Sequence, residues 1–159
     1  MKHLLRRSLR LGALLTVLTT AVLATVTAPA SAHTSLTSIA FAESGCAWTK
    51  GSATILDSAR ILGAGHTQIG TVNLLWNSAE GENCVVTLKS GRTHGYASYT
   101  VAELAIEGDH YHPVEIGNYQ HYAAVAAPAA GKCVQFTGII EDTDGQRYAG
   151  GLGSWAFCG

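Results

Sequence analysis

The stretch from Gly70 to Ser90, GTVNLLWNSAEGENCVVTLKS, constrains the fold more than any other part of the chain. Apolar residues alternate with polar ones on both sides of a polar segment, 77–83, which contains Gly81. Side chains alternate between the two faces of a strand, and a glycine that can take a positive φ suits a turn, so the pattern predicts an antiparallel β-hairpin. Its apolar faces would carry Val72, Leu74 and Trp76 on the first strand and Cys84, Val86 and Leu88 on the second.

Further extended segments follow at intervals that are typical of an all-β domain. Turn-forming clusters rich in Gly and Asp separate them, and apolar residues do not recur at the spacing of a helix. Pro128 and Gly131 also disfavour a helix in the alanine-rich stretch 123–130. We predict an all-β fold, a single-domain antiparallel β-sandwich or barrel-like variant of about seven strands. Besides the hairpin, these strands would be 53–62, 96–106, 118–127, 132–141 and 146–149.

The first 32 residues are typical of an export signal rather than of a folded domain. MKHLLRRSLR holds four of the ten Lys and Arg residues, an apolar run follows, and Ala30-Ser31-Ala32 offers the small residues that signal peptidase accepts. We therefore predict a signal peptide over 1–32 and a secreted domain over 33–159. The Arg6-Arg7 pair leaves both the general and the twin-arginine export route open.

The charge of the chain after residue 32 excludes one class of partner. The leader takes four of the ten basic residues and none of the eleven acidic ones, so six basic residues face eleven acidic ones. An acidic surface repels phosphate backbones, and we expect no nucleic-acid partner. No second hydrophobic span follows the leader, so we expect no transmembrane anchor in the mature chain. The oligomeric state stays open.

Four cysteines, Cys46, Cys84, Cys133 and Cys158, follow the leader. An even count in an exported chain favours two disulfides, and the absence of a C-x-x-C pair argues against zinc or redox work. Four cysteines allow three pairings. We favour Cys46 with Cys84 and Cys133 with Cys158, because each pair ties a less regular segment to a strong strand. In particular, the tail GLGSWAFCG looks too rich in glycine to hold itself.

Two cysteine-bearing motifs resemble those of a known family. They are the hairpin sequence above and HYAAVAAPAAGKCVQFTG at 121–138, followed by a cysteine one residue before the end. Over Gly70 to Gly159 the chain resembles the spore-associated protein A family, with His121-Tyr122 where that family has a tyrosine pair. The resemblance implies a small exported protein of filamentous, spore-forming actinobacteria, found with spores or aerial growth and without an established catalytic activity.

Histidines are the candidate metal ligands. His110 and His112 stand two residues apart, on one face of an extended segment, and His121 could approach them across a hairpin. Cleavage after Ala32 would expose the α-amino group of His33, which could hold copper together with its ring. Unrelated histidines in polar loops would give the same pattern. Asp142 and Asp144 could bind calcium only loosely, and we expect no cofactor.

No catalytic arrangement stands out. The chain has no G-x-S-x-G elbow, and its paired carboxylates, such as Glu80 and Glu82, lie in expected turns, where acids usually serve solubility and turn geometry. Tyrosines offer another kind of site, because exposed rings can form a flat surface for sugars. Half-buried rim positions are the alternative reading of the same residues. The candidates for this surface are Tyr96, Tyr99, Tyr119 and Tyr122.

We therefore expect a secreted, extracellular, spore- or cell-surface-associated protein of structural or interaction type that is not an enzyme. Its partners would be polymers of the spore or cell-wall surface. The first alternative is a carbohydrate- or wall-binding module that uses the exposed tyrosines, and the second is a copper-binding protein that uses His33. A secreted hydrolase inhibitor would also fit the size and the cysteine count.

Overall fold

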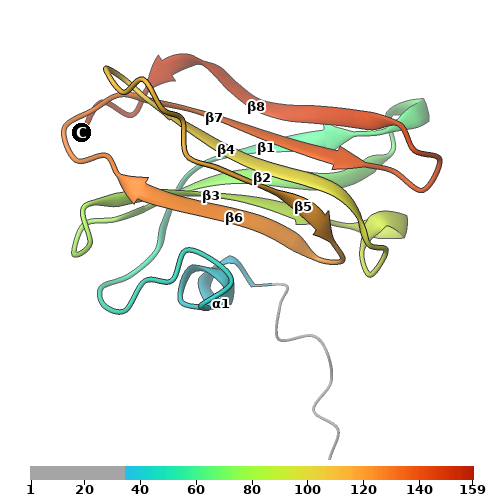
Figure 1. The fold of residues 1–159 in the computed structure, drawn as a ribbon, viewed down its shortest axis with the longest axis horizontal. Coiled ribbons are helices and arrows are strands. Elements are labelled where there is room, and N and C mark those ends of the chain that lie inside the picture. The colour runs from blue at the N-terminus through green and yellow to red at the C-terminus, as the bar shows by residue number, and fades with distance from the viewer. Residues whose placement is uncertain (1–34) are drawn as a thin grey trace, which may run out of the picture.

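A computed structural model describes residues 35–159 (Figure 1). They form two four-stranded antiparallel sheets, with strand orders β1-β2-β3-β6 and β5-β4-β7-β8, which pack face to face. The predicted sandwich is confirmed, with eight strands instead of about seven. The elements are α1 (Leu36–Ala40), β1 (Thr54–Leu62), η2 (Ala64–His66), β2 (Gln68–Asn77), β3 (Glu82–Lys89), η3 (Gly91–Thr93), β4 (Ser98–Ile106), β5 (Val114–Tyr119), β6 (Tyr122–Pro128), β7 (Val134–Glu141) and β8 (Arg147–Ala156).

The predicted hairpin is formed by β2 and β3, which pair antiparallel from Gly70 with Lys89 to Asn77 with Glu82. Gly81 takes a φ of 70° in its turn, as expected. Both faces of the hairpin are buried, which corrects the prediction of one apolar face on each strand. One face meets the opposite sheet, and the other meets the segment that precedes β1.

The central core lies between the two sheets. It takes Val72, Leu74 and Val85 from the hairpin and larger residues such as Leu104 and Phe136 from the second sheet. Full burial of each such side chain stabilises the fold by roughly 1.5–3 kcal/mol. The burial pattern of β7 alternates strictly, which is the pattern of a strand with one face in the core and one toward solvent. This core is what joins the two sheets.

A second, smaller core covers the outer face of the first sheet. Ile39 and Trp48 pack there on Leu75 and Val86 of the hairpin, beside the disulfide between Cys46 and Cys84. Because α1 has only five residues, its stability depends on this packing more than on helix propensity. Such a helix is too short to show a helical period in the sequence, and none was predicted. Across residues 35–159, no helix has the length and hydrophobicity to cross a bilayer.

The expected strand over 118–127 is wrong, because two strands share that range. β5 ends at Tyr119 and β6 begins at Tyr122, with a turn at Gln120 and His121. β5 pairs with β4 in the second sheet, whereas β6 pairs with β3 in the first. The chain therefore passes from one sheet to the other at this turn, which an uninterrupted strand could not do.

The glycine-rich tail is also more regular than predicted. The short strand expected at 146–149 extends over Arg147–Ala156, paired along β7 with one irregularity. At Gly150 an added Cβ would lie 2.9 Å from the carbonyl oxygen of Arg60 in β1. Glycine thus lets the edge strand β8 approach the edge strand β1 of the other sheet. The disulfide between Cys133 and Cys158 pins the end of this strand, in the pairing that we favoured.

Candidate functional site

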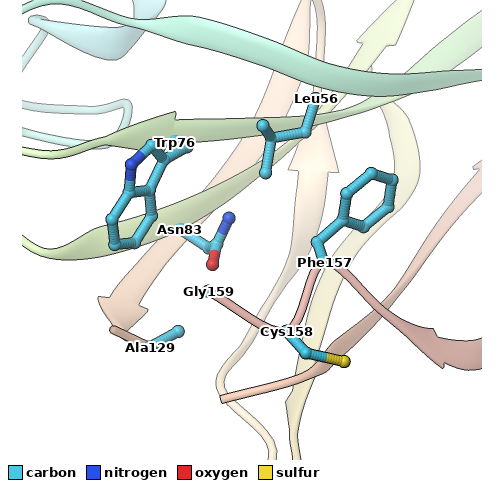
Figure 2. A pocket seen from close by; sticks show the side chains of 7 residues that line it. All are labelled: Leu56, Trp76, Asn83, Ala129, Phe157, Cys158 and Gly159. Atoms are coloured by element: carbon cyan, nitrogen blue, oxygen red, sulfur yellow. The ribbon is translucent and has the colours of Figure 1, made fainter. Parts of the chain in front are cut away.

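A cleft of about 510 Å³ opens at the end of the sandwich where β8 ends. Figure 2 shows Trp76 and Phe157 on opposite sides of it, with Leu56 above and the amide of Asn83 between them and the chain end. Its volume lies within the roughly 300–1,000 Å³ that small-molecule sites occupy. The residues that line it are Leu56, Trp76, Asn83, Ala129, Phe157, Cys158 and Gly159.

Asn83 brings a polar group to this apolar hollow. The residue is 2% exposed, and its Nδ2 donates to the carbonyl oxygen of Leu75 at 3.0 Å. Oδ1 accepts no hydrogen bond from residues 35–159. Among these residues, however, the only fully buried side-chain oxygen or nitrogen without a hydrogen bond is Oδ2 of Asp142. Oδ1 of Asn83 is therefore not sealed off, and it offers a hydrogen-bond acceptor to a molecule in the cleft.

The chain end forms one wall of the cleft because its backbone turns sharply. Phe157 has a φ of 55°, in the left-handed region that non-glycine residues seldom adopt. This conformation lets its ring pack against the central core while the disulfide of Cys158 holds the backbone beside Cys133. No lining side chain carries a charge. Its aromatic rings suit a ligand with a flat or apolar face.

Glu80 in the β2–β3 turn and Glu82 at the start of β3 hold the neighbouring segment in place. Glu82 accepts a hydrogen bond from Nε1 of Trp48 at 2.9 Å. Oε1 of Glu80 accepts from the backbone N–H groups of Thr49 at 3.1 Å and Lys50 at 3.2 Å. The hydrogen bond from Thr49 is the main cause that lowers the pKa of the Glu80 carboxyl. These two acids bind the segment before β1 to the hairpin. The sequence analysis had interpreted them as ordinary turn residues and missed this role.

Lys89 is a buried cation at the far end of the same hairpin. It is 2% exposed, and its Nζ donates to the carbonyl oxygens of Tyr96 (2.6 Å) and Tyr119 (2.9 Å) and to Oγ of Ser98 (2.7 Å). Desolvation lowers the pKa of Lys89 to about 8, while the charge of Glu141 acts in the opposite direction. All three donors of the ammonium are used, so Lys89 joins strands and loops and is not placed to react.

The acidic pair in the β7–β8 turn also has a structural role. Oδ1 of Asp142 accepts from the backbone N–H groups of Asp144 at 2.9 Å and Gln146 at 3.0 Å. The guanidinium of Arg92 lies 3.5 Å from the other oxygen of Asp142 and 3.0 Å from a carboxylate oxygen of Asp144. A protein cation thus stands where a calcium ion would have to bind.

The histidine candidates do not form one site. His33 lies outside the described residues. His110 and His112 lie in the loop before β5, where Nδ1 of His112 is 3.6 Å from a carboxylate oxygen of Glu103. His121 instead meets His94, which sequence reading did not single out, with Nδ1 and Nε2 3.3 Å apart. Within residues 35–159, no three His, Cys, Asp or Glu residues gather as metal ligands.

The four candidate tyrosines do not share one surface. Tyr99 lies on the outer face of the second sheet, beneath the guanidinium of Arg147 at 3.7 Å. The hydroxyl of Tyr122 bonds Oγ of Ser44 on the side that α1 covers, at 2.8 Å. Tyr96 is 48% exposed in a loop.

The fourth, Tyr119, donates its hydroxyl to Glu115, and this bond is the main cause that raises the pKa of Tyr119 to about 12. The four rings therefore do not make a single flat platform. Trp76 and Phe157 line the cleft, while Tyr119 and Tyr122 line a second hollow of about 460 Å³ together with His121. The alternating pattern predicted that Trp76 lies on a core face. Only its position next to the last residue of β2 could have indicated that it reaches the surface.

Comparison with known proteins finds a relative among characterised proteins. No protein-family model matches the chain, and no solved structure matches it significantly. The chain is 36% identical, over 91 residues, to the protein of Streptomyces coelicolor named Spore-associated protein A. The aligned part is 55% of this chain and 56% of the relative, so the match spans about half the length of that protein.

Proposed function

We propose that this chain, which is similar to Spore-associated protein A over about half the length of that protein, is a secreted, non-enzymatic component of the spore or cell surface. It would act through non-covalent contacts with surface polymers. The observation that carries the proposal is the name of its relative, and the structure adds a rigid sandwich whose buried reactive groups are engaged in its own scaffold. The relative's name describes that protein alone, so the location of this chain must be measured.

The chemistry of the described residues supports a role without catalysis. The buried ammonium of Lys89 donates three hydrogen bonds to neighbouring oxygens. The carboxylate of Asp142 accepts a hydrogen bond from the backbone of its own turn and pairs with Arg92. Every cysteine in residues 35–159 is in a disulfide, so the described chain offers no thiol nucleophile. Two disulfides in a domain of this size also favour an oxidising, extracellular setting.

The cleft supports a second candidate, a module that binds neutral polysaccharide. Sugar rings present apolar C–H faces to aromatic side chains and hydroxyl donors to polar ones, and the cleft offers Trp76, Phe157 and the free acceptor of Asn83. The carbohydrate-binding site proposed here is therefore the cleft at the end of the sandwich and not the surface of tyrosines predicted from the sequence.

Extraction of spores tests the main proposal. We expect that salt or detergent releases most of the protein without cleavage of a covalent bond. If the protein occurs only in the culture medium and turns over a substrate, the proposal fails. A pull-down of the protein with spores, vegetative wall, chitin and peptidoglycan then tests the second candidate, because selective retention by one polysaccharide would support it and equal, weak retention by all would reject it.

A further inference from the structure

His94 and His121 lie at the end of the sandwich opposite the cleft, at the end of β3 that carries Lys89. His94 follows η3, and His121 lies in the turn between β5 and β6. Their ring centroids are 4.6 Å apart, and Nδ1 of His121 is 3.3 Å from Nε2 of His94. Neither side chain belongs to the cleft or to the proposed surface contact.

The backbone fixes the two loops that carry these rings. Gly95 donates its N–H to the carbonyl oxygen of Gln120 at 2.8 Å, which ties the residues beside the two histidines together. The ammonium of Lys89 binds the carbonyl oxygens of Tyr96 at 2.6 Å and Tyr119 at 2.9 Å, two residues from each histidine. The two rings are therefore held close before any ligand arrives, which lowers the entropic cost of chelation.

The two nitrogens share a hydrogen bond at 3.3 Å, and the same separation suits two ligands on one metal ion, which would replace that hydrogen bond. Imidazole nitrogens lie about 2.0–2.1 Å from zinc, so a tetrahedral angle puts two of them about 3.3 Å apart. We propose that Nε2 of His94 and Nδ1 of His121 together bind one divalent ion of the zinc or copper type. Each ring then keeps its proton on the other nitrogen, because a ligating nitrogen must offer its lone pair.

The site would be shallow and solvent-accessible. His94 is exposed and His121 is half-buried. No group of three His, Cys, Asp or Glu residues occurs among residues 35–159, so water would complete the coordination. Borderline-soft ions that accept imidazole are favoured here over Mg²⁺ or Ca²⁺, which prefer oxygen ligands. The predicted copper site at His33 is a separate hypothesis, because it needs a free α-amino group on that residue.

Calorimetric titration of the full-length chain with ZnCl₂ tests this site. In that chain Ala32 precedes His33, so no free α-amino group on His33 can contribute. We expect one ion per chain, and an affinity that falls at least about tenfold in His94→Ala and in His121→Ala, because each variant loses half of the chelate. His110→Ala is the matched control, an exposed histidine that should leave the affinity unchanged.

Two further measurements separate ligation from an effect on folding. Saturating zinc should raise the melting temperature of the unaltered chain by about 3 °C at ten times Kd, and that of His94→Ala by less. The imidazole ¹⁵N resonances of Nε2 of His94 and Nδ1 of His121 should shift on addition of zinc. Equal affinity in the unaltered chain and both variants, or no imidazole shift at saturation, would overturn the site.

Discussion

The two ends of the sandwich are held together by different chemistry. At one end the ammonium of Lys89 is buried and bonded to three oxygens, and two loops close around it. At the other end the disulfide of Cys133 with Cys158 and the rings of Trp76 and Phe157 surround a hollow of about 510 Å³. A buried charge requires its full set of partners, whereas apolar contacts are not directional and can leave a space unfilled.

This difference suggests that one end of the sandwich holds the fold together and the other binds a partner. The ammonium of Lys89 has no donor left for a partner. That end also has a hollow of about 460 Å³, lined by Tyr119, His121 and Tyr122, but in it the hydroxyls of Tyr119 and Tyr122 are already bonded to Glu115 and Ser44. The cleft end keeps an acceptor on Asn83 and two aromatic rings within reach of solvent. We therefore place the contact with a surface polymer at the cleft and regard the Lys89 end as the part that holds the two sheets in register.

Lys89→Met should give the largest change. It leaves the carbonyl oxygens of Tyr96 and Tyr119 and the hydroxyl of Ser98 without their donor, at a cost on the order of 4 kcal/mol of the free energy of unfolding. Lys132→Met is the control, because Lys132 is partly exposed and pairs with Asp109 at the surface. Urea denaturation measures both. Equal midpoints for the two variants would show that Lys89 does not hold its end together.

Removal of the disulfide at the cleft end, Cys133→Ser with Cys158→Ser, should rank second. The pair is separated by 25 residues, and the chain-entropy model gives about 3 kcal/mol for a loop of that order. The matched variant, Cys46→Ser with Cys84→Ser, opens a separation of 38 residues on the outer face and should lose about as much. Thermal unfolding measures both losses.

The two disulfide variants should differ in retention by spores. Only the Cys133 and Cys158 pair holds a wall of the cleft, so only its removal should reduce retention under conditions where both variants are folded. Equal retention by the two variants would separate the cleft from the surface contact.

Stability should rise with pH through Lys89. The pKa of Lys89 in the fold is about 8, below its ordinary value of 10.5, so between these values the unfolded chain binds more protons than the folded one. The free energy of unfolding therefore increases with pH in this window, with a slope of up to about 1 kcal/mol per pH unit. Urea midpoints at pH 7, 8 and 9 measure it. The slope should persist in Lys132→Met and disappear in Lys89→Met, and a slope common to both would assign it to other groups.

The strands that the sequence predicted correctly have alternating side chains and clear turns. The hairpin around Gly81 and the strand Val134–Glu141 are examples, since each has a glycine-bearing turn beside it and an apolar face that must be covered. The disulfide pairing followed from the same logic, because a cysteine on a strong strand needs a less regular partner. The alternation of side chains was sufficient to predict a strand wherever one of its faces is apolar and must be covered.

The errors have a common physical cause, which is contact between segments distant in sequence. Nothing in NYQHYAAVAA shows that the chain changes sheets at His121, because that depends on which neighbour each half finds. Nothing local to Lys89 indicates its burial, because only the loops that close over it make it a buried cation. The cleft joins Leu56, Trp76 and Phe157 from three strands or their ends, so no single motif could have indicated it.

Retention of the protein by intact spores is the most direct test of the claim that surface contact lies at the cleft. Trp76→Ala removes one wall of the cleft, and Tyr99→Ala removes an aromatic ring from the outer face of the second sheet. Each variant is compared with the unaltered protein at equal concentration, after circular dichroism has shown that it is folded. The account predicts that Trp76→Ala loses most of its retention and that Tyr99→Ala keeps it. Full retention of Trp76→Ala together with loss in Tyr99→Ala would contradict the account and place the contact on the open sheet face.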